Sequence, residues 1–150
     1  MAASAGQRFV PTGGHTLRSL PGVEVIVETI PAELQQAGLT PAAVGRDLAR
    51  SLQAGGVVVF PSQAANSGAA KAYLDVRVTL LGLRDGSYAV AVQMHLRQTV
   101  ASLVTESSIV NAATWEAGSL VNVTASDLRL VRGEIQAMTD EFLADWKAAH

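Results

Sequence analysis

His95 is the residue of this sequence best placed for chemistry, because it lies inside a strongly patterned segment, whereas His15 and His150 lie near the two ends of the chain. An imidazole can bind a metal ion or transfer a proton near neutral pH. Either role needs further partners around the ring, and neither of the other histidines is positioned to complete a ligand set. We therefore predict no metal site. We expect His95 to pair with Asp75 on a neighbouring strand, where the carboxylate orients the ring; a direct contact of His95 with a ligand stays open as the alternative.

The rest of the sequence gives little support for catalysis. None of its serines lies in a G-x-S-x-G motif, and it has no cysteine that could act as a nucleophile. The glycines lack the spacing of the phosphate-binding motifs and are typical of turns and helix ends. Glu24 and Glu28 would be about 13 Å apart along a strand, too far for a catalytic carboxylate pair, and we interpret them as solvated charges. We predict no catalytic residue and no cofactor, which favours a protein that is not an enzyme.

Asp75 and His95 belong to two runs in which apolar and polar residues alternate, one on each side of the segment LRDGS. The apolar residues carry even numbers in both runs, so directly paired residues must share parity and the connecting loop must have an odd number of residues. A three-residue loop, Arg84-Asp85-Gly86, fits, because its third position needs the left-handed conformation that glycine adopts easily. The predicted register pairs Asp75 with His95, Arg77 with Gln93, Tyr73 with Arg97, Val76 with Met94 and Val78 with Val92.

The polar side of this predicted hairpin is the candidate binding surface. It carries Tyr73, Asp75, Arg77, Gln93, His95 and Arg97, together with Thr79 and Thr99. One face of an antiparallel sheet commonly faces water, so an ordinary solvated face is the alternative interpretation.

Further strands and two helices must hold this hairpin in place. Thr40 and Pro41 predict a helix start and Gly55-Gly56 its end. A second, longer helix is predicted from about Ser126 to Ala148, because apolar residues recur there at spacings of three and four after an approximate capping box. Strands are predicted at Val23–Ile30 and Val57–Phe60, with a weaker one at Val110–Glu116, and PSQAANSGAA is predicted to be a long loop.

These elements predict an α+β fold in which two helices pack on one face of a mostly antiparallel sheet of four or five strands. The expected order is a strand, a helix, three strands, a more weakly patterned fourth and a closing helix. Residues 1–20 are rich in Gly, Ala, Ser and Pro, so we expect a flexible lead-in there. A single domain is predicted from residue 21 to residue 150.

Composition excludes some partners. Hydrophobic residues make up 49% of the 150 residues and charged residues 16%, but no apolar run is long enough to span a membrane. The net charge is −2, with 11 basic and 13 acidic residues and no basic cluster, so nucleic acid is not an expected partner. The absence of cysteine fits both the cytoplasm and the bacterial periplasm. Residues 1–16 lack the pattern of a signal peptide, so we expect that an exported form of this chain has already lost its signal.

Five segments carry a resemblance: GLTPAAVGRDLARSLQAGGVVVF, YLDVRVTL, YAVAVQMHLRQTV, AATWEAG and MTDEFLADWKAAH. Together they resemble a diffuse set of small exported bacterial proteins, whose fold is similar to the N-terminal domain of TolB and to envelope assembly lipoproteins of the LptE type. The resemblance covers roughly residues 21–150. It implies two helices against one face of a sheet, a periplasmic or envelope location and a scaffolding role, and it assigns no catalytic residue.

We therefore expect a non-enzymatic binding or assembly module that uses the polar sheet face or a strand edge to meet a protein partner or a second copy of itself. The alternative is a small-molecule-binding protein or a minor enzyme, with a pocket between sheet and helices near Trp115 and Trp146. Both tryptophans are also explained as core residues.

Overall fold

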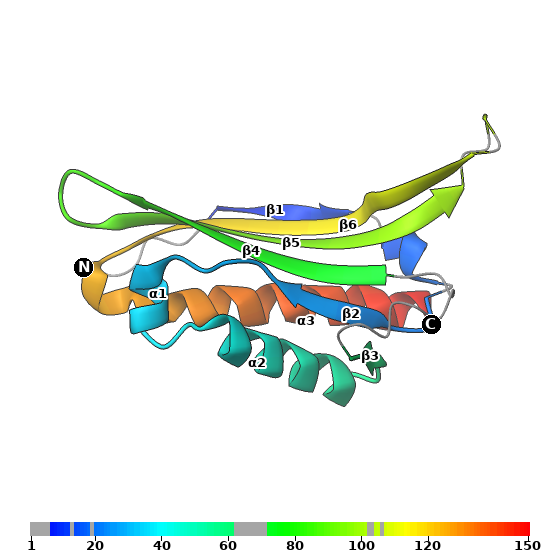
Figure 1. Ribbon diagram of the computed structural model, residues 1–150, viewed down its shortest axis with the longest axis horizontal. Helices are drawn as coiled ribbons and strands as arrows, with labels where there is room; N and C mark the ends of the chain where they lie inside the picture. The colour runs from blue at the N-terminus through cyan, green and yellow to red at the C-terminus, as the bar shows by residue number, and fades with distance from the viewer. Residues whose placement is uncertain (1–6, 13, 19, 62–71, 102–103, 106) are drawn as a thin grey trace.

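A computed structural model describes residues 7–12, 14–18, 20–61, 72–101, 104–105 and 107–150. It confirms an α+β fold with a mostly antiparallel sheet, in which both long helices lie on one face (Figure 1). The strands are β1 Gln7–Thr12, β2 Val23–Val27, β3 Val59–Phe60, β4 Ala72–Gly82, β5 Tyr88–Ala101 and β6 Ser108–Val123. The helices are α1 Ala32–Gln36, α2 Pro41–Ala54 and α3 Val131–Ala149, with 3-10 turns at Gly14–Leu17 and Ala125–Leu130.

The described strands form one six-stranded sheet in the order β1-β6-β5-β4-β2-β3. The pairs β1–β6, β6–β5 and β5–β4 are antiparallel, whereas β2 pairs in parallel with β4 and with β3. The sheet thus has more strands than predicted. The long loop predicted after β3 lies almost entirely outside the described residues.

The central hairpin of β4 and β5 has the predicted register. Asp75 lies opposite His95, and the four other predicted pairs are also present. Gly86 has a φ of 83°, and the Leu83 N–H donates to the Ser87 carbonyl, so the loop between the strands is the expected three residues. The parity of the apolar residues and one left-handed glycine were therefore sufficient to set this pairing.

The helix boundaries follow the prediction at α2 and depart from it at α3. The Thr40 hydroxyl accepts a hydrogen bond from the Ala43 N–H, Pro41 is the first helical residue, and Gly56 after the helix has a φ of 89°. The second helix was predicted from about Ser126, but α3 begins at Val131. The preceding residues form a 3-10 turn, and the Thr124 hydroxyl donates to the Asp127 carboxylate without capping the helix.

Part of the segment predicted to be a lead-in belongs to the fold. β1 pairs with β6, the Leu17 side chain is fully buried, and the Thr16 hydroxyl donates to the Thr114 carbonyl at 3.1 Å. The prediction that residues 1–20 are a lead-in outside the domain is therefore wrong for the described residues 7–12 and 14–17. Strand pairing uses backbone groups, so a segment of low hydrophobicity can still add an edge strand.

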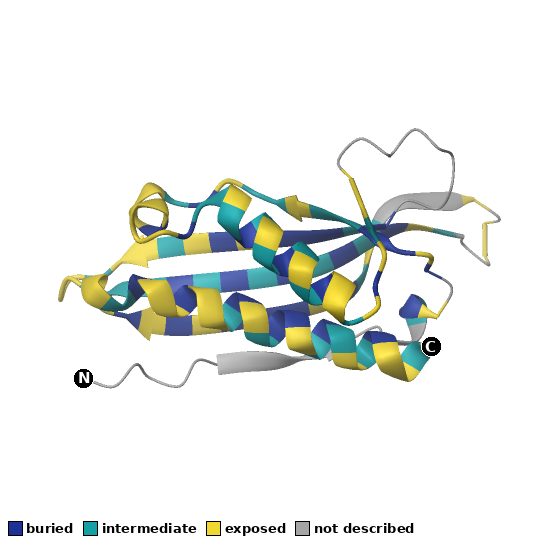
Figure 2. Cartoon of the chain, turned by 90° about the horizontal axis from the view of Figure 1, so that it is seen from below, coloured by how far each residue is buried: buried dark blue, intermediate teal, exposed yellow. Residues whose placement is uncertain are grey.

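The two faces of the sheet differ in what covers them. Both long helices pack on the inner face, where most of the even-numbered residues of β4 and β5 and the odd-numbered residues of β6 from Trp115 to Val123 lie buried (Figure 2). No described helix covers the opposite face, which we call the outer face. Within the described ranges, no helix is both long and apolar enough to span a membrane.

Candidate functional site

All six residues of the predicted binding surface lie on the outer face, since alternation along β4 and β5 puts them opposite the buried residues. They form most of what we call the charged half of this face. Its members are Tyr73, Asp75, Arg77, Gln93, His95 and Arg97, joined by Glu28 after β2 and Glu116 on β6.

Asp75 is the centre of the charged half and is only 4% exposed. The Arg97 Nε donates to its Oδ2 at 2.5 Å, and the His95 Nδ1 lies 3.2 Å from its Oδ1. Both carboxylate oxygens therefore have a partner, which is what a buried charge requires. This arrangement holds the carboxylate in place.

His95 lies between two carboxylates. Its Nδ1 faces Asp75, and its Nε2 is 3.9 Å from the Glu116 Oε2, too far for a hydrogen bond. The Glu116 side chain is half exposed, so Nε2 is the side of the ring that points away from the buried pair. The predicted pair with Asp75 is confirmed, and Glu116 adds a second acidic neighbour.

Arg77 and Glu28 form a second ion pair at the border of the charged half. The Arg77 Nε and Nη2 donate to the two Glu28 carboxylate oxygens at 2.6 and 3.1 Å. This bidentate contact holds the pKa of Glu28 below its ordinary value and raises that of Arg77. Glu28 is a partly solvent-exposed charge, as interpreted, but it has a partner, because the parallel pairing of β2 with β4 brings Glu28 and Arg77 together.

Sequence reasoning missed three features of this surface. It placed Arg97 opposite Tyr73, which is correct for the backbone, but the long side chain reaches diagonally to Asp75. It also missed Glu28 and Glu116 as members of the charged half. The signal for Glu116 was present in the alternation of β6, but that strand was predicted to end there, whereas it continues to Val123.

The other end of the outer face, towards the β4–β5 turn, is apolar. We call it the apolar half; it consists of Leu81, Ala89, Ala91, Gly118 and Leu120, with Thr79 and Asn122 at its border. Leu81 is 63% exposed and Leu120 51% exposed. The register brings these residues together from three strands, and none of them is charged. The polar surface predicted on this hairpin therefore covers only one half of the outer face.

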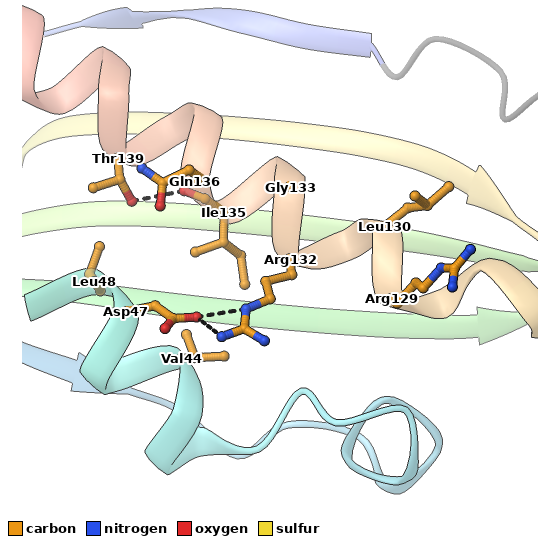
Figure 3. Close-up of a pocket in the computed structure, with 10 residues that line it drawn as sticks. All are labelled: Val44, Asp47, Leu48, Arg129, Leu130, Arg132, Gly133, Ile135, Gln136 and Thr139. Atoms are coloured by element: carbon orange, nitrogen blue, oxygen red, sulfur yellow. Dashed lines mark hydrogen bonds and ion pairs between the residues drawn. The ribbon is translucent and has the colours of Figure 1, made fainter. Parts of the chain in front are cut away.

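A groove between α2 and α3, on the opposite side of the sheet, is a second candidate site (Figure 3). Its volume is about 440 Å³. Neither Trp115 nor Trp146 lines it, since both are buried and pack against Phe142, with ring centroids 5.1 and 6.2 Å from that of Phe142. The indole of Trp115 donates to Asp145 at 2.8 Å. Both tryptophans are core residues.

Within the described part of the chain, no three His, Cys, Asp or Glu side chains gather as a group that could hold a metal ion. No protein-family model matches the sequence, and comparisons with curated proteins and with solved structures find no significant match.

Proposed function

We propose that this chain is a non-enzymatic binding or assembly module of the bacterial envelope, which meets a protein partner across the outer face of its sheet. The observation that carries the proposal is the pair of exposed leucines, Leu81 and Leu120, on a sheet face that no described helix covers. Exposed apolar residues that are gathered on one surface and bordered by polar ones are typical of protein interaction sites.

The charged half defines the chemistry of the partner. Asp75 and Glu28 are neutralised by Arg97 and Arg77, whereas the half-exposed carboxylate of Glu116 faces only His95 among the ion pairs of the described residues. The face therefore favours a partner with an apolar spot that is bordered by basic side chains. Asp75 and its two partners supply a rigid, prearranged surface, so little side-chain freedom would be lost on binding.

Two observations support a role without catalysis. The carboxylate of Asp75 has both oxygens occupied, and the hydroxyl of Ser119 is buried under α3, where it donates to Glu134 at 2.7 Å. The proposed envelope location rests on the resemblance to exported bacterial proteins. Fractionation of cells of the source organism tests that part: recovery of the protein in the periplasmic or membrane fraction supports it, and recovery in the cytoplasm alone contradicts it.

Site-specific photo-crosslinking in these cells tests the partner. A photoreactive amino acid at position 81 or 120 should give a discrete adduct, while one at Gln53, exposed on α2, should not. The variant Glu116→Lys should lower the yield at position 120, because it reverses a charge that faces the basic partner. Mass spectrometry of the adduct identifies the partner as a second copy or as another protein. No adduct at positions 81 and 120, or an equal yield at position 53, would contradict the proposal.

A further inference from the structure

The two helices that border the groove, α2 and α3, converge along their length. Near the end of α2 they touch: a Cβ placed on Gly55 would collide with the Leu143 side chain on α3. Towards the start of α2 they separate, as Figure 2 shows, and the groove lies in that gap. Two side-chain contacts cross between the helices, from Arg132 to Asp47 and from Ser51 to Gln136.

The floor of the groove is apolar and well buried. Val44 and Leu48 on α2 are each 2% exposed, and Ile135 on α3 is 5% exposed. Figure 3 shows Ile135 extending from α3 towards these two residues. A volume of about 440 Å³ lies within the range typical of small-molecule sites, which is about 300–1,000 Å³.

The wall of the groove contains a glycine that packing does not explain. Gly133 lies in the first turn of α3, and a Cβ placed there would meet nothing within 4 Å. Glycine destabilises a helix interior by about 1 kcal/mol relative to alanine. The close contact with Leu143 explains the glycine at position 55, but no such contact exists at Gly133. The absence of a side chain at Gly133 keeps the groove open, which is what a ligand site needs.

The charges at the groove favour an anion. Arg132 is held by Asp47, to which its Nε donates at 2.6 Å. Arg129, in the 3-10 turn before α3, also lines the groove, and no ion pair within the described residues engages it. The lining therefore carries two guanidinium groups and one carboxylate, which leaves one positive charge in excess beside an apolar floor.

We propose that this groove binds a small amphipathic carboxylate, with its apolar body over Val44, Leu48 and Ile135 and its carboxylate towards Arg129. A guanidinium group is well suited to a carboxylate because its donors match the two oxygens. This site lies on the helix side of the sheet and is independent of the partner proposed for the outer face.

Octanoate and 1-octanol are matched probes, since they share the apolar chain and differ in charge. Titration of protein labelled at the Val, Leu and Ile methyl groups should show saturable NMR shifts at Val44, Leu48 and Ile135, with tighter binding of octanoate. The variant Gly133→Leu should weaken both probes by about tenfold, because its side chain occupies the groove, whereas Gly133→Ala should retain binding.

Two further variants separate charge from shape. Arg129→Gln should weaken octanoate by about threefold and leave 1-octanol unchanged, as expected for an exposed ion pair. Arg50→Gln, which removes an exposed cation of α2 outside the groove, should change neither probe. The proposed site is wrong if the groove methyl groups show no saturable shifts, or if Gly133→Leu binds as tightly as the unaltered protein. The carboxylate assignment is wrong if Arg129→Gln affects both probes alike or neither.

Discussion

Two ion pairs on opposite sides of the sheet have nearly the same geometry but very different surroundings. In the outer-face pair, the Arg97 Nε is 2.5 Å from an Asp75 oxygen, and in the interhelical pair, the Arg132 Nε is 2.6 Å from an Asp47 oxygen. The Asp75 side chain is 6% exposed, however, whereas that of Asp47 is 30% exposed. Although it lies on a face that no described helix covers, Asp75 is the more deeply buried of the two carboxylates.

The difference shows that burial within a sheet face does not require a second layer of structure. The side chains that contact Asp75 are those of His95 and Arg97 on β5, which lie on the same face of the sheet. Removing one partner from a buried ion pair leaves a charge without compensation, whereas an exposed charge can return to water. Geometry alone would rank the two pairs as equal; burial predicts that only the first matters much for stability.

The variant Arg97→Met should therefore have the largest effect. It leaves the Asp75 carboxylate buried with His95 as its remaining partner, and we expect the free energy of unfolding to fall by about 3 kcal/mol. Denaturation in urea at pH 7 measures this change. The double variant Asp75→Leu/Arg97→Met should recover most of the loss, because no buried charge is then left unpaired. A loss below about 1 kcal/mol for the single variant would show that Asp75 gains access to water, and burial would not be the deciding factor.

The sequence was sufficient to predict this buried pair's position but not its full set of partners. The cross-strand pairing of Asp75 with His95 can be predicted locally, because the alternating pattern and the turn geometry that set it lie within about 30 residues of chain. The Arg97 contact depends on which of several reachable acceptors a long side chain selects. That selection follows from the diagonal spacing between strands together with burial, which a pairing register does not specify.

Elements that depend on distant pairing were the ones that sequence reasoning missed or shortened. β6 passes through a bulge, where Leu96 lies opposite Trp115 but Arg97 lies opposite Ala113. The extra residue, Thr114, accepts from the Gln98 side chain on β5 at 2.7 Å. A bulge shifts the parity on one side, so a single alternating pattern cannot describe the whole strand. The presence of β1 likewise depends on β6, which lies about a hundred residues later in the chain.

The variant Arg132→Met should have a much smaller effect than Arg97→Met. The Asp47 carboxylate is partly in contact with water, and methionine keeps most of the apolar stem of arginine, so we expect a change below about 1 kcal/mol. The same urea denaturation, run with the two variants side by side, compares the pairs directly. An equal loss for both variants would contradict the importance of burial and would indicate that the interhelical pair holds α2 against α3.

The ion pair of Glu28 and Arg77 should contribute least, and its contribution should depend on pH. Because the pKa of Glu28 is lowered in the folded protein from its ordinary value of 4.5, mainly by the hydrogen bond from Arg77, its contribution is fully present above pH 4.5. The contribution is lost as the pH falls through the lowered pKa of the folded state. The free energies of unfolding of the unaltered protein and of Glu28→Gln, measured between pH 7 and pH 3, should therefore differ most at neutral pH. The two values should become equal in acid.

A matched comparison at the hairpin turn distinguishes this effect from general acid sensitivity. The hydroxyl and the N–H of Ser87 donate to Asp85 and lower the pKa of that carboxyl from its ordinary value of 3.8. As the pH falls, the difference between Asp85→Asn and the unaltered protein should therefore begin to shrink at a lower pH than for Glu28→Gln, since the ordinary pKa of Asp85 is 3.8 and that of Glu28 is 4.5. A stability difference for Glu28→Gln that stays constant down to pH 3 would mean that the carboxylate contributes through packing rather than through its charge. The pair would then resemble neither the buried Asp75 nor the exposed Asp47.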